Sequence, residues 1–235
     1  MHKVILDVEG GQKVAGYREA AAWTRAHPDL AYAHYALSFA LRWGGLYKEA
    51  AQECDIALKL DSANSRFHSC SLVFILLGRY DRARMYIDLD SLSVMERYRR
   101  MDLAILTNDK TTALETIRAV RLGPRDYPDA RLMEAALSGA SPETVQERSR
   151  EAEALYDRIS LPEAYFVDAR HQSWAGQTEA ALRLLRRAIA TGYCSFPVMD
   201  SDPMLANARR LPEYAKLRQE GVACRESFQS QMKIR

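Results

Sequence analysis

The stretch Gly44–Ser62, GGLYKEAAQECDIALKLDS, places small residues at helical spacing after a pair of glycines. Ala50, Cys54 and Ala57 share one face of the helix that this spacing predicts, and the pattern stops at Asp61. Small side chains on one face allow a second helix to approach closely. The stretch therefore predicts a tight turn followed by the second helix of a helical hairpin.

The same pattern recurs along the chain. An alanine follows a glycine or a polar break by about four or five residues in each of five places, at Ala20, Ala50, Ala83, Ala113 and Ala181. The first four are 30 to 33 residues apart, and the last interval of 68 residues leaves room for one more unit. Self-similarity at this period is typical of a solenoid of stacked helix hairpins, none of which buries both of its apolar faces alone.

The unit that begins at Ala31 resembles a tetratricopeptide repeat (TPR), in which large and small residues alternate at set positions of two helices. The residues that carry the resemblance are His34, Leu37, Ser38 and Leu41 in the first helix and Ala50, Cys54 and Ala57 in the second. The resemblance implies an all-α, right-handed, TPR-like solenoid of helical hairpins.

We expect one domain over residues 1–235, with a partial unit 1–30, units 31–63, 64–92, 93–124, 125–160 and 161–192, and a C-terminal cap 193–235. The units between 93 and 160 match the pattern least. Pro203 and Pro212 are placed to start helices in the cap. The tail also resembles, more loosely, TPR regions attached to bacterial serine/threonine kinases, through Tyr193-Cys194, Pro197, Asp202-Pro203 and Pro212. That resemblance implies part of a signalling protein.

Composition indicates a globular chain with 48% hydrophobic and 27% charged residues. The net charge of +2 supplies no strong field toward nucleic acid or a membrane surface, so neither is an expected partner. No apolar run approaches the roughly 18 residues of a membrane span, and the N-terminus lacks a signal-peptide pattern, so we expect a cytoplasmic protein.

The four cysteines are Cys54, Cys70, Cys194 and Cys224, and no C-x-x-C spacing or nearby histidine pair accompanies them. Zinc binding and thioredoxin-like chemistry therefore lack support. We expect Cys54 and Cys70 to act as small buried hydrophobic residues.

The candidate binding surface is the concave face, which the first helices of all units line in such a solenoid. The helix 31–43 has a second stripe of large side chains, and an uncovered stripe of this kind marks an interaction site. Its members are Tyr32, Tyr35, Phe39, Arg42 and Trp43, and the same register in later units gives His68, Leu72, Tyr98, Asp102, Phe166, Arg170 and Trp174. Such a groove suits an extended or helical peptide.

Two observations limit this prediction. Aromatic residues on a repeat helix also pack between adjacent units, which is the alternative explanation of the stripe. The Lys and Asn pattern with which some TPR proteins bind a C-terminal carboxylate is not matched, because Tyr35 and Phe39 stand in place of polar groups.

The chain carries no motif for phosphate, dinucleotide or zinc-protease chemistry and no nucleophile elbow, so no catalytic residue, metal or cofactor is predicted. We predict a non-catalytic protein-interaction scaffold. Two alternatives stay open: an enzyme on a helical-repeat scaffold would have a pocket of ionisable groups with shifted pKa values, and a nucleic-acid binder would gather its basic residues on one face.

Overall fold

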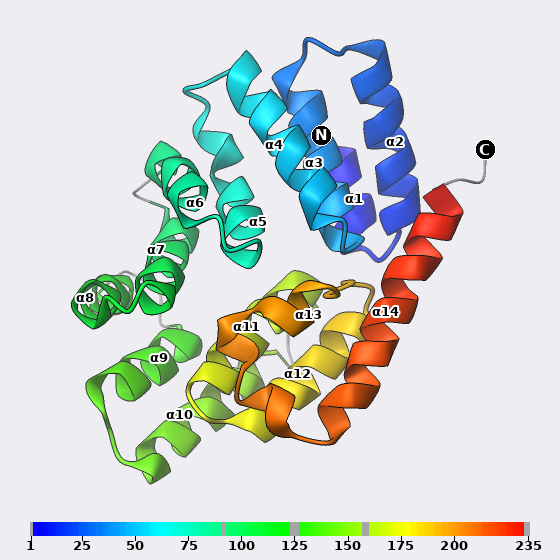
Figure 1. Ribbon diagram of the computed structural model, residues 1–235. Coiled ribbons are helices and arrows are strands. Elements are labelled where there is room, and N and C mark those ends of the chain that lie inside the picture. The colour runs from blue at the N-terminus through cyan, green and yellow to red at the C-terminus, as the bar shows by residue number, and fades with distance from the viewer. Residues whose placement is uncertain (1, 91–92, 123–126, 157–159, 233–235) are drawn as a thin grey trace.

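The computed structural model describes residues 2–90, 93–122, 127–156 and 160–232. These ranges contain fourteen α-helices and four short 3-10 helices, and no strand is found in them (Figure 1). The predicted all-α, TPR-like right-handed solenoid is confirmed.

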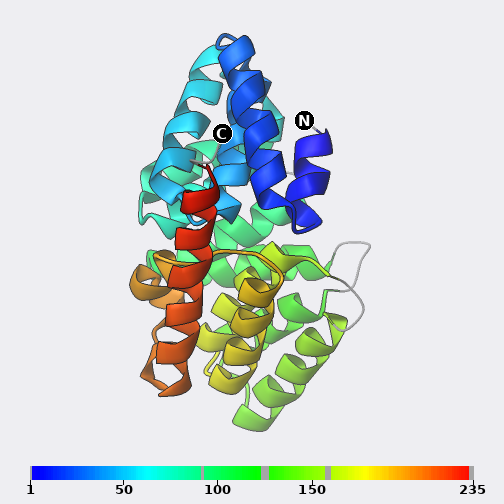
Figure 2. The ribbon, with the colours of Figure 1, turned by 90° about the vertical axis from the view of Figure 1, so that its right-hand side faces the viewer.

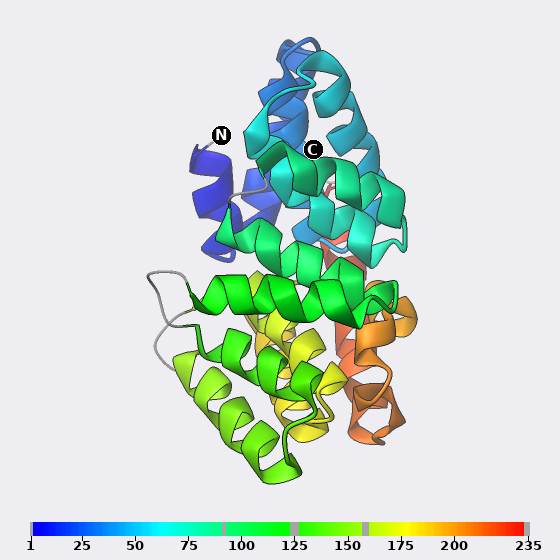
Figure 3. The same ribbon diagram turned by 90° about the vertical axis from the view of Figure 1, so that its left-hand side faces the viewer.

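The helices form antiparallel pairs joined by short turns. The pairs are α1 (His2–Glu9) with α2 (Lys13–Ala26), α3 (Ala31–Trp43) with α4 (Tyr47–Leu60), α5 (Cys70–Leu76) with α6 (Tyr80–Ile87), α7 (Val94–Leu106) with α8 (Lys110–Arg121), α9 (Pro128–Ser138) with α10 (Pro142–Leu155), and α11 (Pro162–Trp174) with α12 (Thr178–Ala190). The 3-10 helix η1 (Ser65–Ser69) precedes α5, and η2 (Asp88–Asp90) follows α6. Figure 3 shows successive pairs stacked on one another.

The α3/α4 hairpin shows why these residues form a repeat unit. Ala50, Cys54 and Ala57 have no exposed surface, as close helix packing requires. The turn between the helices has Gly45 at φ +76°, a conformation that glycine adopts without strain. A Cβ at Gly45 would also lie 2.5 Å from the Phe196 carbonyl oxygen, so the turn is held against the C-terminal segment.

The C-terminal segment closes the array. It consists of α13 (Val198–Ser201), η3 (Pro203–Leu205), η4 (Ala208–Arg210) and α14 (Glu213–Met232). Helix α14 extends from the α11/α12 pair to α2 (Figures 1 and 2). There the fully buried Phe228 meets the ring of Tyr17 edge to face at 5.7 Å and fills the space beside Gly44. The last helix therefore packs directly against the second and third helices.

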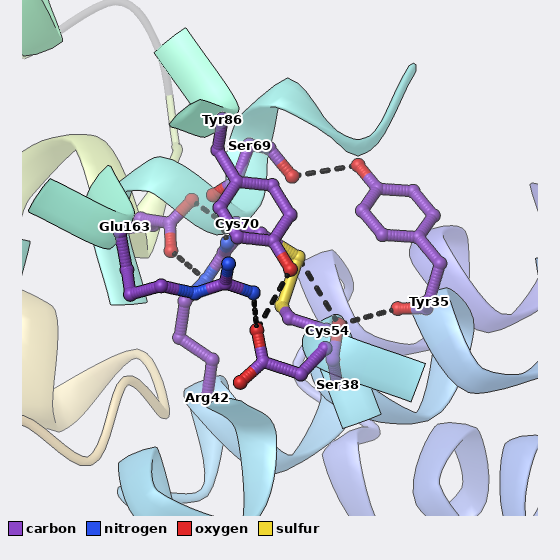
Figure 4. The surroundings of a disulfide bond; sticks show 10 residues. Tyr35, Ser38, Arg42, Cys54, Ser69, Cys70, Tyr86 and Glu163 are labelled. Atoms are coloured by element: carbon purple, nitrogen blue, oxygen red, sulfur yellow. Dashed lines mark hydrogen bonds and ion pairs between the residues drawn. A yellow bond between two sulfur atoms is a disulfide. The ribbon is translucent and has the colours of Figure 1, made fainter. Parts of the chain in front are cut away.

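The cysteines correct one prediction. Cys54 is bonded to Cys70, and Cys194 is bonded to Cys224, so the expectation that Cys54 and Cys70 are simple buried hydrophobic residues is wrong. The first bond joins α4 to the start of α5, which is the next hairpin (Figure 4). The second joins the segment after α12 to α14. The spacing of the cysteines in the sequence did not predict these bonds, because the two partners of each bond belong to different elements.

A buried ionic network joins α7, α11 and the C-terminal segment. Arg170 pairs with Asp102 at 2.6 Å and with Asp202, and His171 Nε2 lies 2.8 Å from Asp102 Oδ1. Burial alone raises the pKa of Asp102, but Arg170 and His171 bring it well below its usual range. Buried charges are stable when they are paired in this way, and loss of one partner leaves the other uncompensated.

Candidate binding pocket

The aromatic stripe predicted on α3 is covered by other parts of the chain. Tyr35 packs on Phe67 with ring centroids 5.1 Å apart, and its hydroxyl lies 2.6 Å from Ser69 Oγ. Trp43 meets Tyr193 edge to face at 5.6 Å. The residues of the predicted set that are buried are Tyr35, Phe39, Arg42, Trp43, Leu72, Tyr98, Asp102, Phe166 and Arg170. The buried side chains of the stripe therefore pack between units and do not form an exposed surface.

Arg42 illustrates how this covering is achieved. Its guanidinium lies 2.7 Å from the Glu163 carboxylate and donates to the Ser69 carbonyl oxygen at 2.9 Å (Figure 4). The side chain thus connects α3 to η1 and to α11 from the interior. A peptide could reach Arg42 only by displacing these partners.

The other members of the predicted set are partly exposed and lie apart. Tyr32 packs on Phe67 edge to face at 5.6 Å. His68 Nδ1 lies 2.7 Å from the Glu96 carboxylate. Trp174, at the end of α11, lines a small hollow with Ile105 and other residues of α7, α8 and α9. These three residues do not form one continuous surface.

A pocket of about 290 Å³ lies where the first helices of five pairs meet. Its walls come from the ends of α1, α3 and α10, from the first two turns of α7, from the start of α9 and from the first three turns of α11. The residues at its walls are Glu9, Trp43, Met95, Tyr98, Arg99, Tyr127, Asp129, Leu155, Tyr156, Leu161, Glu163, Ala164, Val167 and His171. Trp43 and Tyr98 are the two that the sequence prediction includes.

The pocket is open to solvent on one side. Met95 is 50% exposed and Leu161 43%, and Glu9 is also exposed, so these residues border the mouth. Ligand pockets in proteins span about 300 to 1,000 Å³. This one is therefore large enough for a single long side chain and too small for a helix.

Several buried polar atoms of the pocket residues have no hydrogen-bond partner among the described residues. They include Trp43 Nε1, Arg99 Nη1 and His171 Nδ1, on side chains that are 2%, 6% and 1% exposed as whole residues. Arg99 Nη1 lies 3.9 Å from Asp102, which is an ion pair without a hydrogen bond. These atoms are covered by the protein itself, so they are not contacts that the open pocket offers to a ligand.

Carboxylates are the second feature of the pocket. Glu163 is paired with Arg42, whereas among the described residues no Lys or Arg pairs with Glu9 or Asp129. Burial and the charge of Glu163 raise the pKa of Glu9, and burial raises the pKa of Asp129. Asp129 accepts a hydrogen bond of 3.0 Å from the Tyr98 hydroxyl.

One sequence signal could have located part of this pocket. Tyr127-Pro128-Asp129 and Leu161-Pro162-Glu163 both place a large residue, a proline and an acid at the start of a first helix, in equivalent positions of successive units. The prolines occupy the first helical turn, where a missing N–H has no cost. The acid that follows each of them borders the pocket.

Comparison with known proteins identifies the fold. No family model matches the chain, and no curated protein matches it. Among solved structures, a chain from the crystal structure of the APC/C hetero-tetramer Cut9-Hcn1 superposes with a TM-score of 0.61 at 12% identity, over 98% of this chain and 48% of that one. YrrB, described as a TPR protein with an unusual peptide-binding site, gives a TM-score of 0.47 at 15% identity, over 82% of this chain and 100% of that one.

This chain therefore spans about half the length of the Cut9-Hcn1 chain that it matches. No helix in the described ranges combines the length and the apolar character that a membrane span needs. The described residues also contain no cluster of three or more His, Cys, Asp or Glu side chains that could hold a metal ion. At this level of identity the likeness is one of architecture: the chain is built as a TPR-like helical solenoid.

Proposed function

We propose that the chain is a non-catalytic protein-interaction scaffold that binds a segment of a partner protein on its concave side. The observation that carries the proposal is the pocket of about 290 Å³ at the meeting point of five first helices, lined mostly by apolar and aromatic side chains. Its size limits what enters it to one side chain of the bound segment. The rest of the segment would lie across the mouth, beside Met95 and Leu161.

An enzyme is the weaker alternative. His171 borders the pocket and is held by Asp102, which is an arrangement that can serve as a general base. However, the described residues at the pocket walls include no Ser, Thr or Cys that a base could activate. The Asp102–Arg170 pair is buried away from solvent. We therefore attribute the lowered pKa of Asp102 to a structural ion pair and not to a catalytic site.

Nucleic acid is also a weaker candidate. Arginines at the surface pair with acids, as in Arg100 with Asp88, Arg183 with Glu153 and Arg218 with Asp200. Arginines that are already neutralised by acids displace few counterions from the phosphates of a nucleic acid. The main source of affinity for nucleic acid is therefore weak here.

The proposal also extends to the cellular compartment of the protein and to a role in signalling. The two disulfides favour an oxidising compartment over the cytoplasm that the sequence predicts, because such bonds are rare where thiols are kept reduced. A role as the regulatory region of a bacterial signalling protein is supported by the loose resemblance of the tail to kinase-attached TPR regions.

The proposal is tested with a display library of random linear peptides. Val167→Phe and Ala164→Leu each add bulk at the pocket wall, and Ile56→Phe adds similar bulk at an exposed position of α4 as the matched control. We expect selected peptides to lose at least tenfold in affinity against both pocket variants and to keep their affinity for the control. Thermal melting of each variant establishes that it is folded.

A library that yields no binders, or binders that both pocket variants retain at full affinity, would contradict the proposal. Two pocket variants are used so that the result does not depend on one substitution, and because both are on α11, thermal melting is compared for both. Retention of binding by the Ile56→Phe control separates loss of the pocket from general destabilisation.

A further inference from the structure

The structure allows the chemistry of the bound side chain to be named, on the assumption that the proposed function holds. We infer that the pocket binds the basic side chain, Lys or Arg, of an extended peptide segment. Two independent features of the pocket carry this inference: its carboxylates, which have no Lys or Arg partner among the described residues, and its aromatic rings.

Two of the pocket carboxylates have no Lys or Arg ion-pair partner among the described residues. Glu163 is neutralised by Arg42 at 2.7 Å, and Arg99 lies 3.9 Å from Asp102. Within the described residues, Glu9 and Asp129 are left without a Lys or Arg partner. Partly buried charges of one sign are stabilised by an opposite charge far more than exposed ones are, because water screens them less. An ammonium or guanidinium group supplies that charge.

The raised pKa of the Glu9 carboxyl group agrees with a cation bound beside it. Burial and repulsion from Glu163 raise the pKa of Glu9, and Arg42 offsets this in part. A cation bound beside Glu9 offsets this repulsion, as Arg42 already does in part. An anionic ligand would increase it, so the pocket discriminates against acidic side chains.

The aromatic rings provide the second feature. Trp43, Tyr98, Tyr127 and Tyr156 all border the pocket, and Tyr98 and Tyr127 are arranged edge to face with centroids 6.2 Å apart. Cations of Lys and Arg are attracted to the faces of such rings, most strongly where water is excluded. The apolar stem of either side chain is also suited to a wall that includes Val167 and Ala164.

The test titrates the full chain with three capped pentapeptides, acetyl-Ala-Ala-X-Ala-Ala-amide with X as lysine, norleucine or glutamate, and follows binding by calorimetry or amide NMR shifts. We expect the lysine peptide to bind at least tenfold more tightly than the norleucine peptide, and the glutamate peptide to bind most weakly. Added salt should weaken the binding of the lysine peptide but not of the norleucine peptide.

Glu9→Gln and Asp129→Asn should each reduce the preference for lysine over norleucine by threefold or more. Asn still accepts from Tyr98, so the Asp129→Asn change isolates the charge. The matched control is Glu226→Gln, an exposed acid on α14 outside the pocket, which should leave the preference within twofold of wild type.

Equal binding of the lysine and norleucine peptides would overturn the inference, as would tighter binding of the glutamate peptide. Spermidine that binds as tightly as the lysine peptide would also overturn it, since the site would then be one for a free amine. If the display library selects peptides that depend on the pocket but lack basic residues, the scaffold function stands and this inference fails.

Discussion

At the scale of single residues, the interior of this protein holds several ionisable groups whose environment decides their charge. Asp168 on α11 is almost fully buried, and its Oδ2 accepts a 3.3 Å hydrogen bond from Gln172 while Oδ1 has no partner. Burial and the charge of Asp129 raise the pKa of Asp168 to about 7, and His171 lowers it in part. The folded state therefore keeps a proton here that the unfolded state releases near pH 4.

Asp168→Asn should stabilise the protein in a pH-dependent way. Because the folded pKa is raised, the folded state binds more protons between pH 4 and 7, and the stability due to Asp168 is lost as the pH rises through that window. Each pKa unit corresponds to about 1.4 kcal/mol, so the gain from Asn grows by a few kcal/mol from pH 4 to pH 8. Urea unfolding of both proteins across this range measures it. A difference that is constant with pH would show that Asp168 is ionised throughout.

At the scale of helices, the contact of α3 with α14 depends on the absence of a side chain at Gly44. A Cβ there would lie 2.0 and 2.1 Å from two carbons of the Phe228 ring, and Phe228 is fully buried. Gly44 has an ordinary helical φ of −79°, so space and not backbone strain requires glycine. Gly221 on α14 is less restricted, since its nearest neighbour is the flexible Met199 side chain at 3.0 Å.

Gly44→Ala should lower the free energy of unfolding by about 1–3 kcal/mol, or more if Phe228 is expelled. For a chain of this size, that corresponds to a fall in the melting temperature of roughly 2–4 °C per kcal/mol. Gly221→Ala serves as the matched control and should be close to neutral. Phe228→Leu should cost less in the Gly44→Ala background than in the wild type. Additive effects of the two changes would argue against the contact.

The helices show which contacts can be predicted from the sequence and which cannot. The hairpin of α3 and α4 could be predicted because Ala50, Cys54 and Ala57 make a local pattern, and all three are fully buried. The role of Trp43 could not, because the ring that covers it belongs to Tyr193, which lies far along the chain. An aromatic stripe has the same sequence pattern whether solvent or a distant segment faces it.

Charged residues that the sequence analysis placed in the binding groove are buried for a related reason. Asp102 and Arg170 suggested a polar groove, since charged residues are rarely buried unless they are paired. They are paired with each other, across 68 residues of sequence. The cysteine pairs were missed in the same way. Tyr98, which the register of the first helices selected, lies at the pocket wall, and its role in binding stays a prediction.

At the scale of the whole molecule, the solenoid is closed by the C-terminal segment. Cys224 of α14 is bonded to Cys194, and the Cys194 amide donates to the Trp43 carbonyl oxygen at 2.9 Å. Lys13 donates to the Gly192 carbonyl oxygen at 2.9 Å. These contacts join elements that are remote in sequence, unlike the neighbour-to-neighbour contacts of an open repeat array.

Replacing Cys194 and Cys224 with serine should lower the unfolding free energy by about 3–4 kcal/mol, on a chain-entropy model for the 30-residue loop. Small-angle X-ray scattering should then show a larger radius of gyration as α14 detaches. The matched control replaces Cys54 and Cys70, which close a 16-residue loop between adjacent hairpins, and should destabilise without expansion. Four free thiols in unreduced, denatured wild-type protein would contradict both bonds.

Closure by α14 also restricts how this protein can change in evolution. An open solenoid gains or loses a hairpin with little effect on distant units, so its length varies by duplication. Here an extra hairpin anywhere between α3 and α12 would carry Phe228 away from Gly44 and separate the first helices that meet at the pocket. The number of hairpins between α3 and α14 is thus restricted by the contact of Phe228 with Gly44.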